Sequence, residues 1–313
     1  MDFRITDFLG ADIILWALFN SIVILLLVLD LGVLSRKAHV VSAREAATWS
    51  AVWIAVSLAF NAFVYAWYGY ERALEFLTGY LIEKSLSVDN MFVFVMIFSY
   101  FNIPGVGQPK VLKWGVLGAL AMRAVLIFVG AAALEAFHWV MYLFAAVLIV
   151  TAVRMMIQKE TRIEPQKNPA VKLFKRIMPV TGELHDEKFI VKQSGMKYAT
   201  PLLIALIVVE TTDLIFAMDS IPAIFAVTTD IFIVYTSNVF AILGLRALYF
   251  LLSGAVRRFT YLKIGLAIVL LFVGAKMLIA DFYKIPITLS LALVMGILAI
   301  SIIASWARLS IKP

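Results

Sequence analysis

Two short polar stretches lie inside long apolar runs and decide the fold: EKSLSVDN at residues 83–90 and DLIFAMDS at residues 213–220. Each begins with an acid and has an aspartate six residues later, followed by a small polar residue. An ionised side chain at the centre of a bilayer costs about 2.5–3.5 kcal/mol on insertion scales, so it needs a partner or a function. If the surrounding runs cross a membrane, these stretches predict a buried charged site.

The chain around the two stretches is too apolar for a water-soluble domain. Of its 313 residues, 63% are hydrophobic and 15% are charged, against roughly half and a quarter in soluble domains. About 20 apolar residues suffice to cross a hydrocarbon core of about 30 Å. We therefore expect an all-α membrane protein with about nine transmembrane helices. The predicted spans are 13–34, 47–68, 73–100, 112–133, 136–156, 200–227, 231–253, 261–280 and 287–306.

The net charge of +7 is explained by the loops between these spans. Alternate loops are basic, as expected of loops that face the cytoplasm. The pattern predicts an external N-terminus and a cytoplasmic C-terminus in the cell inner membrane, with the lipid bilayer and not nucleic acid as the partner. The basic segments contain Arg36, Lys37 and Arg44, then Lys110 and Lys113, the stretch 159–197, Arg257 and Arg258, and finally Arg308 and Lys312.

Three consecutive helices are repeated in the second half of the chain. The helix after each motif carries one arginine, Arg123 or Arg246, and the next span carries one cation near its end, Arg154 or Lys276. Spans 3–5 and 6–8 would run in opposite directions, which is the inverted repeat of many secondary transporters. The predicted domains are an N-terminal two-helix segment, the first repeat, a cytoplasmic linker, the second repeat, and a C-terminal helix and tail, at residues 1–72, 73–157, 158–198, 199–280 and 281–313.

The linker is expected to be solvated, with a short amphipathic helix around residues 171–178. A lipid-binding or regulatory site in this linker is the weaker alternative. Protein partners are not predictable from the sequence.

The buried charges suggest a cation site between the two repeats. The acids are Glu83, Asp89, Glu210, Asp213 and Asp219, and the predicted counter-ions are Lys84, Arg123 and Arg246. Five acids against three bases leave two negative charges, which a divalent cation or bound protons would neutralise. The alternative is a network of salt bridges that joins helices. In it, Arg123 pairs with Glu83 or Asp89, and Arg246 pairs with Asp213 or Asp219. In that interpretation Asp30 pairs with Arg36 or Lys37.

The spacing of the acids constrains such a site. Six residues on a straight helix turn the second acid about 120° away from the first, whereas the residue at seven returns to the same face. Glu83 then lies over Asn90, and Asp213 over Ser220. We expect a helix break at Pro222, because proline removes a backbone donor and clashes with the preceding turn. A looser backbone is also expected near residues 85–90.

Oxygen ligands without cysteine or a histidine at mid-membrane favour a hard cation such as Mn²⁺, Mg²⁺ or Ca²⁺ over Zn²⁺ or Cu⁺. The chain has no cysteine, so it has no thiol redox chemistry of its own. We expect no tightly bound cofactor. The sequence also lacks HExxH and a phosphate-binding glycine loop, so an enzyme is not expected.

Four long stretches resemble the TerC family: residues 29–46, 79–90, 197–228 and 233–252. The resemblance implies membership of the LysE-like exporter group, association with tellurium resistance, a link to alkaline or metal stress, and Mn²⁺ efflux in several relatives. It makes the acidic motifs the metal site, with the candidate ligands Glu83, Asp89, Asn90, Asp213, Asp219 and Ser220, and Glu210 close by. Other relatives are described as redox modulators, which this chain could be only through a partner.

The leading hypothesis is a membrane transporter that exports a divalent metal cation, with Mn²⁺ as the transported substrate and protons as a candidate coupling ion. The alternative is a non-transporting membrane scaffold, or a redox or metal-stress modulator that acts through partners. Deleting part of the stretch 158–197 should inactivate a scaffold and largely spare a transporter.

Overall fold

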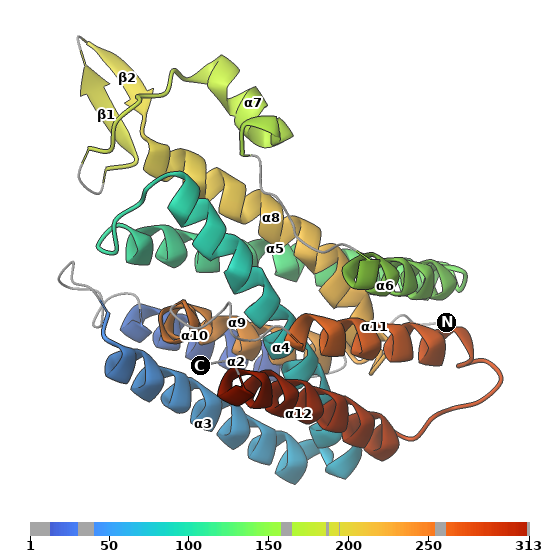
Figure 1. Ribbon diagram of the computed structural model, residues 1–313. Coiled ribbons are helices and arrows are strands. Elements are labelled where there is room, and N and C mark those ends of the chain that lie inside the picture. The colour runs from blue at the N-terminus through green and yellow to red at the C-terminus, as the bar shows by residue number, and fades with distance from the viewer. Residues whose placement is uncertain are drawn as a thin grey trace.

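The computed structural model describes residues 13–30, 41–157, 165–185, 188–193, 195–253 and 261–311, and the chain is almost entirely helical (Figure 1). Every predicted span contains a helix, and the seventh contains two. The helices of the bundle are α2 (Ile13–Val28), α3 (Ala43–Tyr68), α4 (Tyr70–Tyr100), α5 (Gln108–Ala136), α6 (Val140–Ile157), α8 (Pro201–Phe225), α9 (Ile231–Leu243), α10 (Leu245–Leu252), α11 (Leu262–Leu278) and α12 (Ile287–Ile311).

Five of the described helices are long and apolar enough to cross a membrane by themselves, namely α3, α5, α6, α8 and α12. A sixth span is formed if α9 and α10, which meet at 43°, are taken together. The other predicted spans contain α2 and α11, which are shorter, and α4, which carries the charges of the first motif. The architecture is that of a multi-pass membrane protein, and the count of nine spans stays a prediction.

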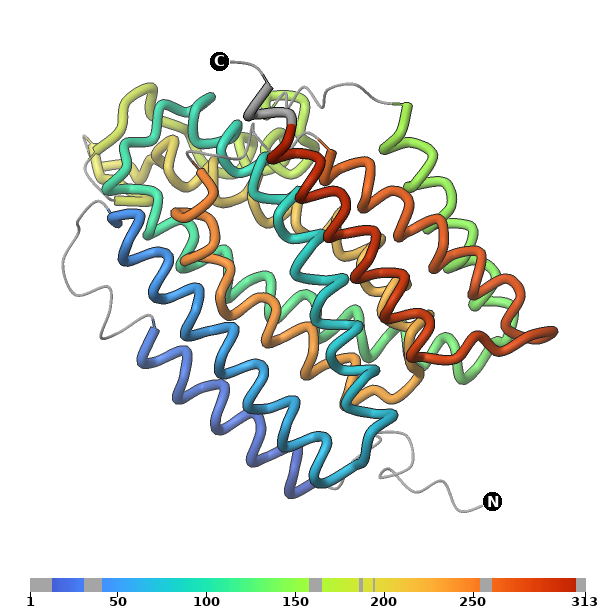
Figure 2. Tube along the Cα trace, turned by 60° about the horizontal axis from the view of Figure 1, so that its bottom comes forward, coloured from blue at the N-terminus to red at the C-terminus, as the bar shows by residue number. Residues whose placement is uncertain are grey.

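The connections between helices gather at two ends of the bundle (Figure 2). At one end, Tyr249 of α10 donates to Gln108 at the start of α5 over 3.0 Å. At the other end, Thr228 after α8 donates to Glu75 near the start of α4 over 2.8 Å. Helix α4 therefore begins where α8 ends, so the helices that carry the two acidic motifs run in opposite directions.

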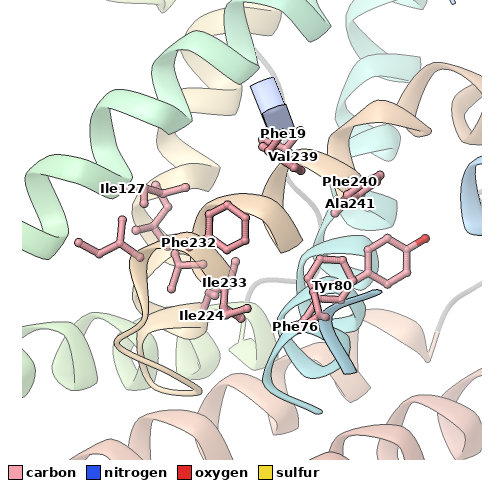
Figure 3. Close-up of a cluster of buried hydrophobic side chains, with 14 of the residues drawn as sticks. Phe19, Phe76, Tyr80, Ile127, Ile224, Phe232, Ile233, Val239, Phe240 and Ala241 are labelled. Atoms are coloured by element: carbon pink, nitrogen blue, oxygen red, sulfur yellow. The ribbon is translucent and has the colours of Figure 1, made fainter. Parts of the chain in front are cut away.

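Helix α9 lies at the centre of the bundle. All of its residues from Ile231 to Leu243 are buried except Tyr235, as expected of a helix that is apolar on every side. Aromatic rings of α2, α3 and α4 surround it. The ring of Phe76 on α4, for example, has its centroid 6.0 Å from that of Phe240 on α9 (Figure 3). This packing fixes the position of α9 against α4.

The linker is more ordered than the sequence predicts. The amphipathic helix is confirmed as α7 (Pro169–Ile177), after a short turn η2 (Pro165–Lys167). The strands β1 (Ile190–Gln193) and β2 (Met196–Ala199) form an antiparallel pair that is not predicted from the sequence. Each strand has only four residues, too few to show a clear alternation of apolar and polar side chains. Val171 of α7 packs in a core cluster with Leu202. Deleting the linker would uncover this core, so the deletion does not discriminate as expected.

The predicted helix distortions are wrong in position. Helix α4 is continuous from Tyr70 to Tyr100, and α8 continues through Pro222 to Phe225. Since Pro222 stands in the last turn, the hydrogen bond it removes is close to where the helix ends anyway. The break occurs instead at Gly244, between α9 and α10. A Cβ atom there would lie 2.9 Å from the Trp53 Cβ, which leaves room only for glycine.

Replacing Gly265 with alanine should destabilise the contact between α11 and α12. The added Cβ would lie 2.8 Å from the Ser301 Cβ of α12, so the helices must move apart, and overpacking of this kind typically costs about 1–3 kcal/mol. The measurement is the melting temperature of the purified protein, with Gly296→Ala on α12 as the control because no atom lies within 4 Å of its added Cβ. Ser301→Gly should restore stability to the Gly265→Ala chain, and equal melting temperatures for both alanine variants would contradict the packing argument.

An exposed contact joins the loop after α11 to the start of α6. Tyr142 donates to the Asp281 carboxylate over 2.6 Å, and the His138 Nε2 lies 3.0 Å from the same oxygen. Both contacts hold the pKa of Asp281 below its ordinary value of 3.8, with the Tyr142 hydrogen bond as the larger cause.

Because the folded-state pKa of Asp281 is lowered, its stabilising effect is present at neutral pH and is lost as the pH falls from about 3.8 through the folded value. Hydrogen exchange of residues 279–286 should therefore be faster in Tyr142→Phe than in the unmodified chain at pH values above 3.8. The difference should shrink in more acidic solution. A difference that is independent of pH would show that the ionised carboxylate contributes nothing.

Candidate functional site

Arg123 of α5 is the centre of the charged cluster. Its side chain is only 1% exposed, and it bridges two helices from the two acidic motifs. It forms an ion pair with Glu83 of α4. On the other side, its Nη2 lies 3.1 Å from the Asp213 Oδ1 of α8, and its Nε lies 3.4 Å from Oδ2. The planar guanidinium suits such forked contacts with a carboxylate, which lysine could not reproduce.

Two neutral side chains complete the cluster. Asn238 of the central helix α9 donates its Nδ2 to the Glu83 Oε2 over 3.3 Å, and Arg123 approaches the Ser220 hydroxyl at 3.4 Å. Asp213 and Ser220 therefore share one face of α8, as their spacing of seven residues predicts, and both contact Arg123. Two carboxylates and one guanidinium leave one formal negative charge where α4, α5, α8 and α9 meet.

Two buried oxygen atoms near Glu83 have no hydrogen-bond donor among the described residues: the Asn238 Oδ1 and the Ser87 Oγ. Ser87 stands one turn after Glu83 on the same face of α4. Leaving a buried polar atom unpaired costs about 1–3 kcal/mol, and such atoms in native proteins often mark the place of a water or an ion. The cluster thus has unused oxygen ligands beside a buried carboxylate.

The second acid of each motif lies apart from this cluster, as the spacing predicted. Asp219 accepts a hydrogen bond from Thr151 of α6 over 2.7 Å and lies near Arg154. Asp89 is within electrostatic reach of Lys263 on α11. Across the described part of the chain, no three acidic or histidine residues are grouped closely enough to hold a metal ion. Asn90, also a predicted ligand, is buried on α4.

Glu210 lies between the cluster and the linker. Its carboxylate packs so closely on Gly118 of α5 that an added Cβ would overlap it, and it lies near enough to Asp213 for the charges to interact. The next residue, Thr211, accepts a hydrogen bond from Asn168 at the start of α7 over 2.8 Å. The linker therefore contacts α8 at the residue next to Glu210.

The predicted counter-ions have different roles. Arg123 pairs with Glu83 as expected and takes Asp213 as well. The alternative of a salt-bridge network paired Arg246 with Asp213 or Asp219, and that pairing is wrong. Arg246 bonds to the Asp30 carboxylate at 3.0 Å and to its main-chain oxygen at 2.9 Å. Arg36 and Lys37, the partners predicted for Asp30, lie outside the described residues. Lys84 donates to the main-chain oxygen of Ala241 over 3.1 Å, beside the break at Gly244.

The sequence motifs do not point to Ser87, Asn168 or Gly118. Ser87 could have been found from its spacing of four residues from Glu83. The other two depend on contacts between segments far apart in the chain, which no local pattern reveals.

The fold and the cluster define a class: a multi-pass helical membrane protein with an ionic network buried where its helices of opposite direction meet. The chain belongs to the TerC family, described as "Integral membrane protein TerC family", which matches residues 68–311. It is 54% identical to an uncharacterized membrane protein of Myxococcus xanthus, over 93% of this chain and 91% of the relative.

Two further relatives share a functional name. The chain is 50% identical to the "Putative membrane-bound redox modulator Alx" of Salmonella typhi and 49% identical to the protein of the same name from Escherichia coli (strain K12). Each match covers 94% of this chain and 95% of the relative. No solved structure is detectably similar to the chain.

Proposed function

We propose that this protein is a transporter that exports a divalent metal cation, with Mn²⁺ as the leading candidate, through the buried cluster of Glu83, Asp213, Arg123 and Asn238. The observation that carries the proposal is the pair of unpartnered oxygen atoms, the Asn238 Oδ1 and the Ser87 Oγ, beside the buried Glu83 carboxylate. Carboxylate, amide and hydroxyl oxygens are the ligands that hard cations prefer.

Arg123 has a defined part in this mechanism. Its guanidinium holds both carboxylates in the described conformation, so an arriving cation must compete with it for the same oxygen atoms. When the cation binds, Arg123 withdraws from at least one carboxylate, and when the cation leaves, the ion pair closes again. Protons can neutralise the same carboxylates, which makes them the candidate coupling ion.

The arrangement of the helices supports alternating access. Helix α4 packs on α9 of the other repeat, and α8 packs in the reciprocal way on α5. Because α4 and α8 also run in opposite directions, a two-fold inverted relation between residues 73–157 and 199–280 accounts for the packing. We propose nine spans in the cell inner membrane, with an external N-terminus and a cytoplasmic C-terminus.

The test is metal flux in proteoliposomes that contain only this protein. Mn²⁺, Mg²⁺, Ca²⁺, Fe²⁺ and Zn²⁺ are offered separately, with and without an imposed pH gradient. Flux of Mn²⁺ above that of protein-free vesicles is expected, with the gradient changing its rate if protons are coupled. Absence of flux for every cation would overturn the transporter proposal.

The relatives' name favours a second candidate function, that of a redox modulator. Since the chain has no cysteine, thiol chemistry would require a partner protein or a bound cofactor. In that case the purified chain should show no metal flux, whereas its removal from cells should still alter their redox balance.

A further inference from the structure

Helix α7 has a well-defined start. The Asn168 side chain accepts hydrogen bonds from the main-chain nitrogens of Ala170 at 2.9 Å and Val171 at 3.3 Å, and Pro169 occupies the first turn. Both features favour a helix start at this position. Its exposed surface is therefore fixed in orientation.

The apolar side of α7 is only half covered by protein. Val171 is 1% exposed, and Phe174 packs against the same core cluster. Leu173 and Ile177, four residues apart and so on one face, are 60% and 75% exposed. The rest of the helix surface is basic and exposed, with Lys172, Lys175 and Arg176. A surface with apolar residues at its centre and cations beside them is typical of helices that lie in a membrane interface.

The contact between α7 and α8 limits how far the start of α7 can lie from the membrane. Asn168 contacts Thr211, which stands ten residues after the start of α8 and therefore about 15 Å along its axis. The 25 residues of α8 extend about 37 Å, only about 7 Å more than a hydrocarbon core of about 30 Å. Because the excess length of α8 is shorter than the distance from its start to Thr211, Thr211 lies within the depth of the membrane, and the start of α7 lies no farther from the bilayer centre than the membrane surface.

We propose that α7 binds the membrane leaflet on the linker side, inserting Leu173 and Ile177 among the lipids and holding anionic phospholipid headgroups with Lys172, Lys175 and Arg176. The depth of Thr211 and the three positive charges favour this occupant over a soluble protein partner. The helix thereby anchors Asn168 at its start, which contacts Thr211 next to Glu210. This inference does not depend on whether the protein transports a metal.

The absence of cysteine from the chain allows a direct test. Leu173→Cys and Ile177→Cys, each carrying a spin label, are reconstituted at one chain per nanodisc. The discs contain phosphatidylcholine alone or phosphatidylcholine mixed with phosphatidylglycerol. Accessibility of the label to oxygen and to a water-soluble nickel complex reports its depth. Lys192→Cys on the exposed β1 is the matched control.

Labels at 173 and 177 should be accessible to oxygen and shielded from nickel in the anionic discs, and the label at 192 should remain accessible to nickel. Replacing Lys172, Lys175 and Arg176 with glutamine should remove the dependence on anionic lipid, at roughly fivefold in the binding equilibrium per charge. Nickel accessibility equal to that at 192 in both discs would overturn the proposal. Shielding that is the same in neutral and anionic discs would overturn the headgroup contacts, and shielding seen only with two chains per disc would assign the surface to a second copy.

Discussion

Replacing Arg123 with glutamine is expected to lower the stability of the folded protein by about 3–5 kcal/mol, the usual result of removing one partner from a buried ion pair. Glu83 and Asp213 would then be left in a buried site without their shared cation. The protein should become scarce in membranes and lose its melting transition at temperatures where the unmodified chain is folded. Thermal unfolding in detergent and membrane abundance measure the effect.

Matched variants separate the charge from the shape of Arg123. Lys284→Gln, in the exposed loop before α12, removes a cation without touching the cluster and should have no effect. Arg123→Lys should recover only part of the stability, because lysine lacks the fork that reaches both carboxylates. Adding Glu83→Gln to Arg123→Gln should recover part of the loss, since fewer charges are then unpaired. Normal stability of Arg123→Gln alone would show that the cluster is not what holds these helices together.

Glu83→Gln and Asp213→Asn are expected to abolish Mn²⁺ flux in proteoliposomes while leaving the protein folded and abundant. Each variant keeps the size of the side chain and leaves Arg123 paired with the remaining carboxylate. However, it removes the negative charge that a divalent cation requires. Glu135→Gln, at the exposed end of α5, is the control and should transport normally. Full flux by Glu83→Gln and Asp213→Asn would remove the central cluster from the transport pathway.

Asp89→Asn and Asp219→Asn test whether the outer acids also belong to the pathway. The sequence motifs predict that both variants lose efflux at normal abundance. In the described conformation neither residue touches Arg123, so loss of flux would mean that the cation passes a second acidic site between the central helices and α6 or α11. Normal efflux by both would confine the site to Glu83 and Asp213.

The membrane class, the positions of the helices and the candidate charges could be predicted from the sequence. Apolar runs long enough to cross a bilayer have no stable alternative to helices there, so residues 112–133 and 287–306 could be assigned without tertiary information. The burial of Glu83 and Asp213 followed in the same way, because each lies in the middle of such a run. Helical geometry also predicted that Asp89 and Asp219 point elsewhere.

Which charges meet was decided only by the tertiary structure. Arg123 and Arg246 look equivalent in the sequence, yet the first joins both motifs and the second binds Asp30, two residues after the end of α2. The break at Gly244 likewise depends on the close approach of Trp53, not on a local signal such as Pro222. An ion pair depends on how helices far apart in the chain pack against one another, whereas a span depends only on the hydrophobicity of its own residues.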